Sequence, residues 1–435
     1  MVNVAVVGMG YVGIPVALTL AKSGLEVIGL DIDQEKVDSL NNSQYPLKGE
    51  EPGIQNLLEE VIDKQLFHAS VDFSDAENAD AWLVCVQTPF LVDEFRPNFK
   101  ALKGAVSEIS KNLSPNSVVV IESTIPPGTT ESVVIPLLES HSSLVAGEDF
   151  GVGHCPERVM PGKLINNLTT YNRVLGGIDD NTHSVMIDIY SRITNGDLYC
   201  TDIKTAEVVK TFENTYRDVE IAIANDFARY CDSVGVDFFE VRDQVNTVEA
   251  RNLHLPGGGV GGHCIPKDTW LLAYGSKDNY DPNFLTMARK VNDSMPNHIS
   301  EKCISIVNKF NLNPSESVVT ILGLSYLEES DDVRNSPSAT LYNILTKQFR
   351  EVRVHDHYAD DYPGIENQKN IEVAVKDSDL IVIMVGHQLY RSLDLRKIGN
   401  LMRNKLLVDS RNSFSKTYLE DEGFAFDILG RGRSW

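Results

Sequence analysis

Short runs of apolar residues, each followed by glycine or polar residues, recur near both ends of the chain. Continuous apolar runs of this length are typical of strands that are buried on both faces of a parallel sheet. They cover residues 2–7, 26–30, 81–86, 117–121, 318–326, 352–356, 380–385 and 406–409. Because helix-like stretches alternate with these runs, we expect an α/β protein with two doubly wound, Rossmann-like domains.

The hydrophobic pattern changes near Asp202, where apolar positions take up helical spacing. This predicts a long central helix over residues 203–233, and the chain stays helix-rich to about Phe310. A chain of 435 residues exceeds the usual size of one core, so more than one domain is expected. We predict a dinucleotide-binding domain at 1–201, a helical domain with a glycine-rich Cys loop at 202–310, and a second α/β domain at 311–435.

The turn after the first predicted strand has the spacing of a dinucleotide-binding motif. It precedes a helix and reads Gly8-Met9-Gly10-Tyr11-Val12-Gly13. Such glycines let a pyrophosphate approach the helix N-terminus, where unpaired N–H groups and the helix dipole favour anions. Asp31 ends the second strand, 18 residues after Gly13, and is placed to accept hydrogen bonds from the adenosine ribose. Its charge would repel a 2′-phosphate, which favours NAD over NADP; the alternative is a solvated loop acid.

Thr88 and Thr124 follow the predicted strands at 81–86 and 117–121. In an open parallel sheet, ligands bind beyond the carboxyl ends of the strands, so both threonines are expected to line the cofactor site. The alternative is that each of them caps a helix or belongs to a turn.

One thiol, that of Cys264, lies in a glycine-rich loop that reads Gly258-Gly259-Val260-Gly261-Gly262-His263-Cys264-Ile265-Pro266-Lys267-Asp268. The glycines allow close approach of a ligand, and the nearby cation favours the reactive thiolate. Beside a hydride acceptor, such a nucleophile suggests chemistry at the aldehyde level. A lone Cys is, however, most often a small buried apolar residue.

Lys210 and Asn214 lie four residues apart on the predicted central helix. They therefore project from one face and are able to approach the same ligand atom. Taken alone, the pair also suits an ordinary solvated helix face.

The charge balance limits the classes of partner. With 39 basic and 62 acidic residues the formal net charge is −23, which argues against nucleic acid and anionic membranes and favours a small-molecule partner. The six cysteines are widely spaced, so neither a disulfide framework nor a metal site is indicated. No apolar run reaches the roughly 18 residues of a membrane span, and no signal peptide precedes the first strand, so we expect a cytoplasmic protein.

Several motifs, in order along the chain, resemble those of UDP-glucose/GDP-mannose dehydrogenases, and the resemblance covers essentially the whole chain. They are the turn at 8–13, Ser123-Thr124 with Pro127-Gly128-Thr129, Pro156-Glu157-Arg158, the helix with Lys210 and Asn214, the loop at 261–268, and the segment 331–337. Within the family, the segments 155–163, 213–219 and 260–264 are most similar to UDP-N-acetyl-D-mannosamine dehydrogenases. His263 stands where the glucose enzymes typically carry a smaller residue, which argues against UDP-glucose.

The resemblance implies an NAD-dependent, four-electron oxidation of a sugar C6 alcohol to a carboxylate, which consumes two NAD per sugar. Lys210 and Asn214 would stabilise the developing alkoxide, and Cys264 would hold the aldehyde as a thiohemiacetal and then a thioester. The thioester would be hydrolysed with the help of three residues among which the roles stay open: Asp268, Glu157 and Thr124.

The resemblance also implies how a UDP-sugar is bound by the 311–435 domain and its surroundings. Arg334 would bind the diphosphate and, with Lys267, lie near the cofactor. Arg251 would be supplied to the neighbouring subunit, which implies a homodimer or a higher homo-oligomer; the alternative is an exposed loop arginine. The expected substrate contacts come from Glu157, Arg158, Lys163, Lys210, Asn214, Arg251, His254, Gly261, His263 and Arg334. Arg158 alternatively serves as a structural partner of Glu157.

UDP-N-acetyl-D-mannosamine is the expected substrate, with its uronic acid used for a surface polysaccharide. UDP-N-acetylglucosamine and UDP-glucose remain alternatives, because a few pocket side chains decide between such sugars. A two-electron 3-hydroxyacid dehydrogenase would need no thiol. A nucleotide-sugar or NAD sensor would need neither Lys210 nor Cys264.

Overall fold

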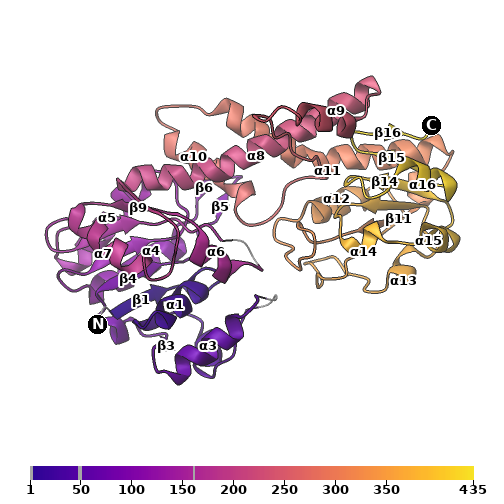
Figure 1. The fold of residues 1–435 in the computed structure, drawn as a ribbon. Helices are drawn as coiled ribbons and strands as arrows, with labels where there is room; N and C mark the ends of the chain where they lie inside the picture. Colours follow the sequence, from indigo (N-terminus) through magenta and orange to yellow (C-terminus); the bar gives the residue numbers. More distant parts are fainter. Residues whose placement is uncertain (1–2, 48–50, 160–161) are drawn as a thin grey trace. The chain divides into compact units, whose positions relative to one another are not determined.

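The structure, a computed structural model, describes residues 3–47, 51–159 and 162–435 (Figure 1). The chain forms two compact units. Unit 1 comprises Met1–Glu213 and Trp270–Asp281, and unit 2 comprises Asn214–Thr269 and Pro282–Trp435. Two of their three boundaries fall inside helices, α8 (Ile203–Val234) and α10 (Ile265–Ser276), and the third lies between Asp281 and Pro282. The division into three domains expected from the sequence stays a prediction.

Unit 1 is built on an eight-stranded sheet with the order β10-β9-β8-β7-β4-β1-β2-β3 (Figure 1). Strands β8 and β9 pair antiparallel, and the other neighbours pair parallel. The strands are β1 (Asn3–Val7), β2 (Glu26–Leu30), β3 (Phe67–Ser70), β4 (Ala81–Val84), β7 (Val118–Ile121), β8 (Gly151–His154), β9 (Arg173–Gly177) and β10 (Leu198–Thr201). The predicted strands are confirmed to within a few residues; Val2 lies outside the described residues.

Helices cover both faces of this sheet, as a doubly wound fold requires. On one face an apolar cluster includes residues of α1 (Gly13–Lys22), α2 (Gln34–Asn41), α3 (Ile54–Asp63), α6 (Leu164–Thr170) and α7 (Asp180–Tyr190). The cluster on the other face includes residues of η1 (Phe73–Ala76), α4 (Lys100–Asn112) and α5 (Ile135–Ser142), near the π-turn η2 (Thr130–Val134). Helix α1 is buried along almost its whole length because its residues are apolar on every side.

A two-stranded hairpin, β5 (Phe90–Leu91) with β6 (Arg96–Pro97), belongs to the same unit. Phe95 at its turn packs edge-on against Trp270, with the ring centroids 6.3 Å apart, and Phe90 packs against Tyr274 at the same distance. These aromatic contacts fix the later part of α10 within unit 1.

Unit 2 contains a six-stranded sheet with the order β12-β11-β13-β14-β15-β16. It is parallel except at β15 with β16, which confirms a second Rossmann-like sheet. One face packs on α8, α9 (Phe238–Val245), α11 (Asn283–Lys309) and α12 (Pro337–Leu345); the other packs on α13 (Ile371–Val375), α14 (Gln388–Arg391), α15 (Leu395–Leu401) and α16 (Lys416–Asp421). The strands are β11 (Val318–Leu322), β12 (Glu351–His355), β13 (Leu380–Ile383), β14 (Leu406–Asp409), β15 (Ala425–Ile428) and β16 (Gly432–Arg433), preceded by η3 (Pro314–Glu316).

Within the described ranges, none of the helices combines the length and the apolar character that crossing a membrane requires.

Candidate active site

The glycine turn of unit 1 has the geometry that its sequence predicts. Gly8 has a φ of 96°, and its N–H donates to the carbonyl of Leu30 at 2.7 Å. A Cβ on Gly13 would lie 1.9 Å from the carbonyl oxygen of Gly8, so only glycine fits at the start of α1. A Cβ on Gly10 would meet no protein atom within 4 Å, so packing within the protein does not require glycine there. The backbone at Gly10 is therefore open for a phosphate group to approach the N-terminus of α1.

Asp31 lies at the end of β2, next to this turn. Its carboxylate accepts from the N–H of Met9 at 2.8 Å and from the N–H of Asp33 at 3.0 Å, and it pairs with Lys36 at 2.9 Å. A carboxylate offers about four lone-pair sites, so one remains for a ribose hydroxyl. Asp31 therefore fixes the turn, and its role in binding the ribose stays a prediction.

Thr88 and Thr124 lie close together, beyond the ends of the paired strands β4 and β7. The hydroxyl of Thr88 donates to the carbonyl of Thr124 at 2.6 Å, and Ser123 donates to the carbonyl of Val86 at 2.5 Å. The two loops are thus joined where the expected cofactor site begins.

Glu207 on α8, which the sequence reading missed, fixes the loop that follows Thr124. Its carboxylate accepts from the N–H of Gly128 at 2.5 Å and from the N–H and hydroxyl of Thr130 at 2.9 and 2.6 Å. Burial raises the pKa of Glu207 to about 6, although these donors favour the charged form. A buried Glu on a helix gives no local signal, because its partners lie far away in the sequence.

Glu157 follows β8 and is buried in an ion pair with Arg173, whose Nη1 lies 3.0 Å from Oε2. The other oxygen accepts from the N–H of Arg158 at 2.6 Å. The side chain of Arg158 instead pairs with Glu213 at 2.5 Å and donates to the carbonyl of Asn172 at 2.8 Å. Glu157 is therefore bound by the N–H of Arg158 and the guanidinium of Arg173, whereas the guanidinium of Arg158 binds Glu213 and Asn172.

A second buried carboxylate, Glu122, lies in the same group and was also missed. It accepts from the hydroxyl of Tyr190 at 2.7 Å and from the thiol of Cys85 at 3.6 Å. Burial raises the pKa of Glu122 to about 7, against the opposing effect of Arg173. Glu122 directly follows β7 and precedes Ser123-Thr124, and this position at the end of a central strand could have identified it from the sequence. Arg173 thus forms an ion pair with Glu157 and also favours the charged form of Glu122.

In unit 2, Cys264 directly precedes α10 and is exposed. Its carbonyl accepts from the N–H groups of Lys267 and Asp268 at 3.1 and 3.0 Å, so the thiol lies at the first turn of this helix. The preceding Gly262 has a φ of 87°, donates its N–H to the carbonyl of Arg334 at 2.8 Å, and accepts from the side chain of Asn335 at 3.0 Å. The segment 331–337 therefore holds the thiol loop.

Tyr326 also packs against this loop. A Cβ on Gly261 would lie 2.4 Å from the Cβ of Tyr326, and one on Gly262 would lie 2.8 Å from its ring. These two glycines are needed because the ring occupies the space of a side chain.

Asn214 and Asp268, both expected in catalysis, are in direct contact. The amide of Asn214 donates to one oxygen of Asp268 at 2.5 Å, and Lys267 donates to the other at 2.6 Å. Asp268 is fully buried. Both oxygens are thus held in place beside the helix start that carries Cys264.

His263 is held uncharged. Burial, with Lys267 and Arg334 nearby, lowers the pKa of His263 to about 4. At neutral pH its imidazole is therefore uncharged, with one nitrogen that donates and one that accepts.

The remaining expected substrate residues are dispersed. Arg334 pairs with Asp332 at 2.5 Å, and its side chain is 41% exposed. His254 pairs with Glu220 at 3.0 Å. Arg251 is exposed in unit 2, whereas Lys163 is exposed and Lys210 is buried in unit 1.

The two sheets share one device that the sequence reading missed. In unit 2, Gly323 has a φ of 100°, and Asp356 accepts from the N–H groups of Leu324 and Ser325 at 2.6 and 2.9 Å. This repeats the arrangement of Gly8 and Asp31. Asp356 also accepts from two further N–H groups and contacts His387 at 3.3 Å, so both of its carboxylate oxygens are engaged by protein groups.

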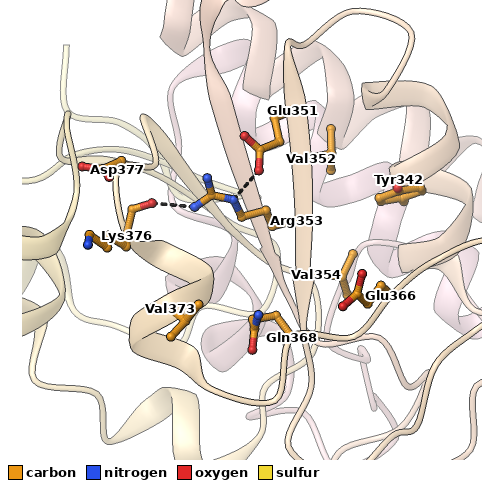
Figure 2. A pocket seen from close by; sticks show the side chains of 10 residues that line it. All are labelled: Tyr342, Glu351, Val352, Arg353, Val354, Glu366, Gln368, Val373, Lys376 and Asp377. Carbon is orange, nitrogen blue, oxygen red and sulfur yellow. Dashed lines mark hydrogen bonds and ion pairs between the residues drawn. The ribbon is translucent and has the colours of Figure 1, made fainter.

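A surface pocket with a cavity volume of about 490 Å³ lies beside the edge strand β12 (Figure 2). Its Arg353 already donates to Glu351 at 2.6 Å and to the carbonyl of Lys376 at 2.5 Å. None of the expected site residues lines it, and we assign it no part in the chemistry.

Three models of the UDP-glucose/GDP-mannose dehydrogenase family match the chain: the NAD binding domain at residues 2–194, the central domain at 204–294 and the UDP binding domain at 320–416. The chain is 36% identical over 430 residues to the UDP-N-acetyl-D-mannosamine dehydrogenase of Pyrococcus horikoshii, with 99% of both chains covered.

Two solved structures are similar over nearly the whole chain. The UDP-D-ManNAc dehydrogenase from Pyrococcus horikoshii has a TM-score of 0.92 and 35% identity, with 99% of both chains covered. The NDP-N-acetyl-D-galactosaminuronic acid dehydrogenase from Methanosarcina mazei Go1 has a TM-score of 0.91 and 36% identity, with 99% of this chain and 95% of that chain covered.

Proposed function

We propose that this chain, which belongs to the UDP-glucose/GDP-mannose dehydrogenase family and is an NAD-dependent oxidoreductase, oxidises the C6 alcohol of UDP-N-acetyl-D-mannosamine to the carboxylate. The observation that carries the choice of sugar is the 36% identity to an enzyme of that name across 99% of both chains. The position of His263, directly before the thiol, supports a sugar other than glucose, as the sequence predicts. The similarity to the Methanosarcina mazei enzyme makes UDP-N-acetylgalactosamine the second candidate.

The proposed chemistry assigns the cofactor one role and the chain the others. NAD, when bound, accepts a hydride from C6 in each of the two oxidations. The bare Gly10 and the N–H groups at the start of α1 would hold its pyrophosphate, and Asp31 its ribose. Lys210 would take the proton of the C6 hydroxyl and stabilise the alkoxide, with Asn214 donating to the same oxygen or to its bound water.

Cys264 would then hold the aldehyde. Its sulfur forms a bond to the aldehyde carbon while the carbonyl oxygen takes up a proton, which gives a thiohemiacetal. After the second oxidation the thioester carbon is attacked by water, the carbon–sulfur bond breaks, and the thiol and the carboxylate are released. The fixed Asp268 supports a role in orienting this water, whereas Glu157, locked by Arg173, supports an electrostatic role beside Thr124.

We also propose that the diphosphate of the sugar nucleotide is bound by Arg334 and Lys163, near Gly261. The chain would divide near residues 201 and 310 into an NAD-binding domain, a helical domain with the thiol loop, and a domain that binds the UDP-sugar. The N–H of Gly262 donates to the carbonyl of Arg334, which places this arginine next to the thiol loop and supports its role in binding the diphosphate. The residues Arg158, Arg251 and His254 complete the proposed substrate contacts.

A homodimer would bury an apolar stripe on α8. Tyr216, Ile223, Phe227, Tyr230 and Val234 are each at least 40% exposed and recur every three, four or seven residues. This is the spacing of helices that pack against each other. Replacing Phe227 with Glu should give a monomer by light scattering, whereas the control F284E, at the exposed start of α11, should not; a monomeric parent chain would contradict the proposal.

The proposed function is tested with a panel of sugar nucleotides. The pure protein is incubated with NAD and, separately, UDP-N-acetylmannosamine, UDP-N-acetylglucosamine, UDP-N-acetylgalactosamine and UDP-glucose, while NADH is followed and the product is identified by mass spectrometry. We expect the highest kcat/KM and a uronate with UDP-N-acetylmannosamine. A higher kcat/KM with any other sugar would contradict the choice of substrate.

A further inference from the structure

Four buried polar residues between α8 and α11 have no part in the chemistry described above. Asp218 and Asn225 lie seven residues apart on α8, and Arg289 and Asn292 lie three apart on α11. Such spacing places each pair on one face of its helix. All four are 0% exposed, and all belong to unit 2. A set of polar side chains in the apolar core of a helix pair requires a reason, because burying them costs free energy.

The four residues form a continuous chain of hydrogen bonds. Asp218 accepts from Arg289 at 2.6 Å and from Asn292 at 2.7 Å, and Asn292 accepts from Asn225 at 2.8 Å. Asn292 also donates to the backbone carbonyl of Asp218 at 2.9 Å. The side chains of Asp218, Asn225 and Asn292 are thus linked in series, so each bond fixes the geometry of the next, whereas Nε and Nη2 of Arg289 lack hydrogen-bond partners among the described residues.

Both ends of the network reach the segment that carries the thiol. Asn225 accepts from the N–H of Gly257 at 2.9 Å, seven residues before Cys264. Asp218 accepts from the hydroxyl of Thr269 at 3.1 Å, five residues after it. The segment 257–269 is thus tied to α8 before and after the thiol, and Thr269 directly follows the fixed Asp268.

We propose that this network positions the Cys264 loop, so that Asp218, Asn225 and Asn292 are positioning residues for the capture of the aldehyde. An apolar pair of helices would pack as well without them, but apolar contacts are not directional and would leave the loop ends untethered. The chemical part rests on the proposed function. A nucleophile displaced by about 1 Å loses up to about a hundredfold in rate. A loosened loop should therefore release aldehyde before the second oxidation.

The test cuts one tether at a time. Thr269→Val removes the bond to Asp218 at nearly constant volume, and Asn225→Ala removes the bond to Gly257. Asp218 is left in place, because its loss would strand the buried Arg289. The matched controls are Thr320→Val and Asn367→Ala, which remove similarly buried hydrogen bonds far along the chain: Thr320 donates to the Ala374 carbonyl at 2.8 Å, and Asn367 donates to the Asp356 carbonyl at 2.9 Å.

Two measurements read the result. Amide hydrogen exchange of residues 257–265 should rise at least about tenfold in T269V and N225A and stay within about twofold of the parent in the controls. The aldehyde trapped by hydroxylamine, per UDP-sugar oxidised, should rise about tenfold or more in the same two variants, with KM for the sugar within about twofold.

The outcomes separate the two proposals. Exchange that rises equally in variants and controls, or does not rise, overturns the positioning role, and so does an unchanged share of trapped aldehyde when exchange has risen. If the parent protein forms no NADH with any UDP-sugar, the proposed function fails, while the exchange measurement still decides whether the network holds the loop.

Discussion

Replacing Arg173 with Met should strongly destabilise unit 1. Arg173 and Glu157 are 4% and 7% exposed at their side chains and lie 3.0 Å apart, and the guanidinium also stacks 5.0 Å from the centre of the Tyr190 ring. Removing one partner of a buried ion pair costs roughly 3–5 kcal/mol, because the other charge stays buried without compensation. We expect R173M to lose about 4 kcal/mol of unfolding free energy at pH 7.

The assay uses the positions of the three tryptophans. Trp82 and Trp270 belong to unit 1 and Trp435 to unit 2, so urea unfolding followed by fluorescence in a W435F background reports on unit 1. The control is R192M, which breaks an exposed pair with Asp188 and should cost at most about 1 kcal/mol.

A double variant separates the ion pair from simple loss of packing. Adding Glu157→Gln to R173M removes the stranded charge, so the double variant should recover about 2 kcal/mol relative to R173M. A loss in R173M no larger than that of R192M, or a double variant less stable than R173M, would refute this reasoning.

Three further results are expected. C264S should lower steady-state turnover at least about a thousandfold, since Ser is a far weaker nucleophile; full turnover would rule out the thioester route. Burial raises the pKa of Glu207 above its ordinary 4.5 to about 6, so its contribution to stability is present below pH 4.5 and lost as the pH rises through 6. Between pH 4 and 7 the unfolding free energy of the parent should fall by about 2 kcal/mol more than that of E207Q, because Glu122 titrates in both proteins; equal falls would contradict this. D31N should narrow the preference for NAD over NADP by about tenfold in kcat/KM, and an unchanged ratio would show that Asp31 only shapes the turn.

The strands and the glycine turn were predictable because their signals are local. Continuous apolar runs mark β1, β2, β4 and β14. The glycine motif at 8–13 predicts the tight turn in which a Cβ on Gly13 would clash with Gly8. The contact between Asn214 and Asp268 joins two segments that the sequence reading had singled out separately.

The hydrogen-bond and ion-pair partners of the buried carboxylates were not predictable in this way. Glu207 binds a loop 79 residues earlier in the chain, and Arg289 reaches Asp218 across 71 residues. Each of these residues has the local pattern of an ordinary helix face, and only the packing of distant elements shows which atoms they hold. For the same reason the ion pair of Glu157 with Arg173, 16 residues later in the chain, could not be predicted from the neighbouring Arg158.

The number of NADH molecules formed per UDP-N-acetylmannosamine consumed tests the account most directly. The thiol, held beside Asn214, Lys267 and Asp268, is expected to retain the aldehyde until it has been oxidised again. We therefore predict two NADH per sugar and no aldehyde trapped by hydroxylamine. One NADH per sugar, with free aldehyde as the product, would contradict the proposal that Cys264 retains the aldehyde.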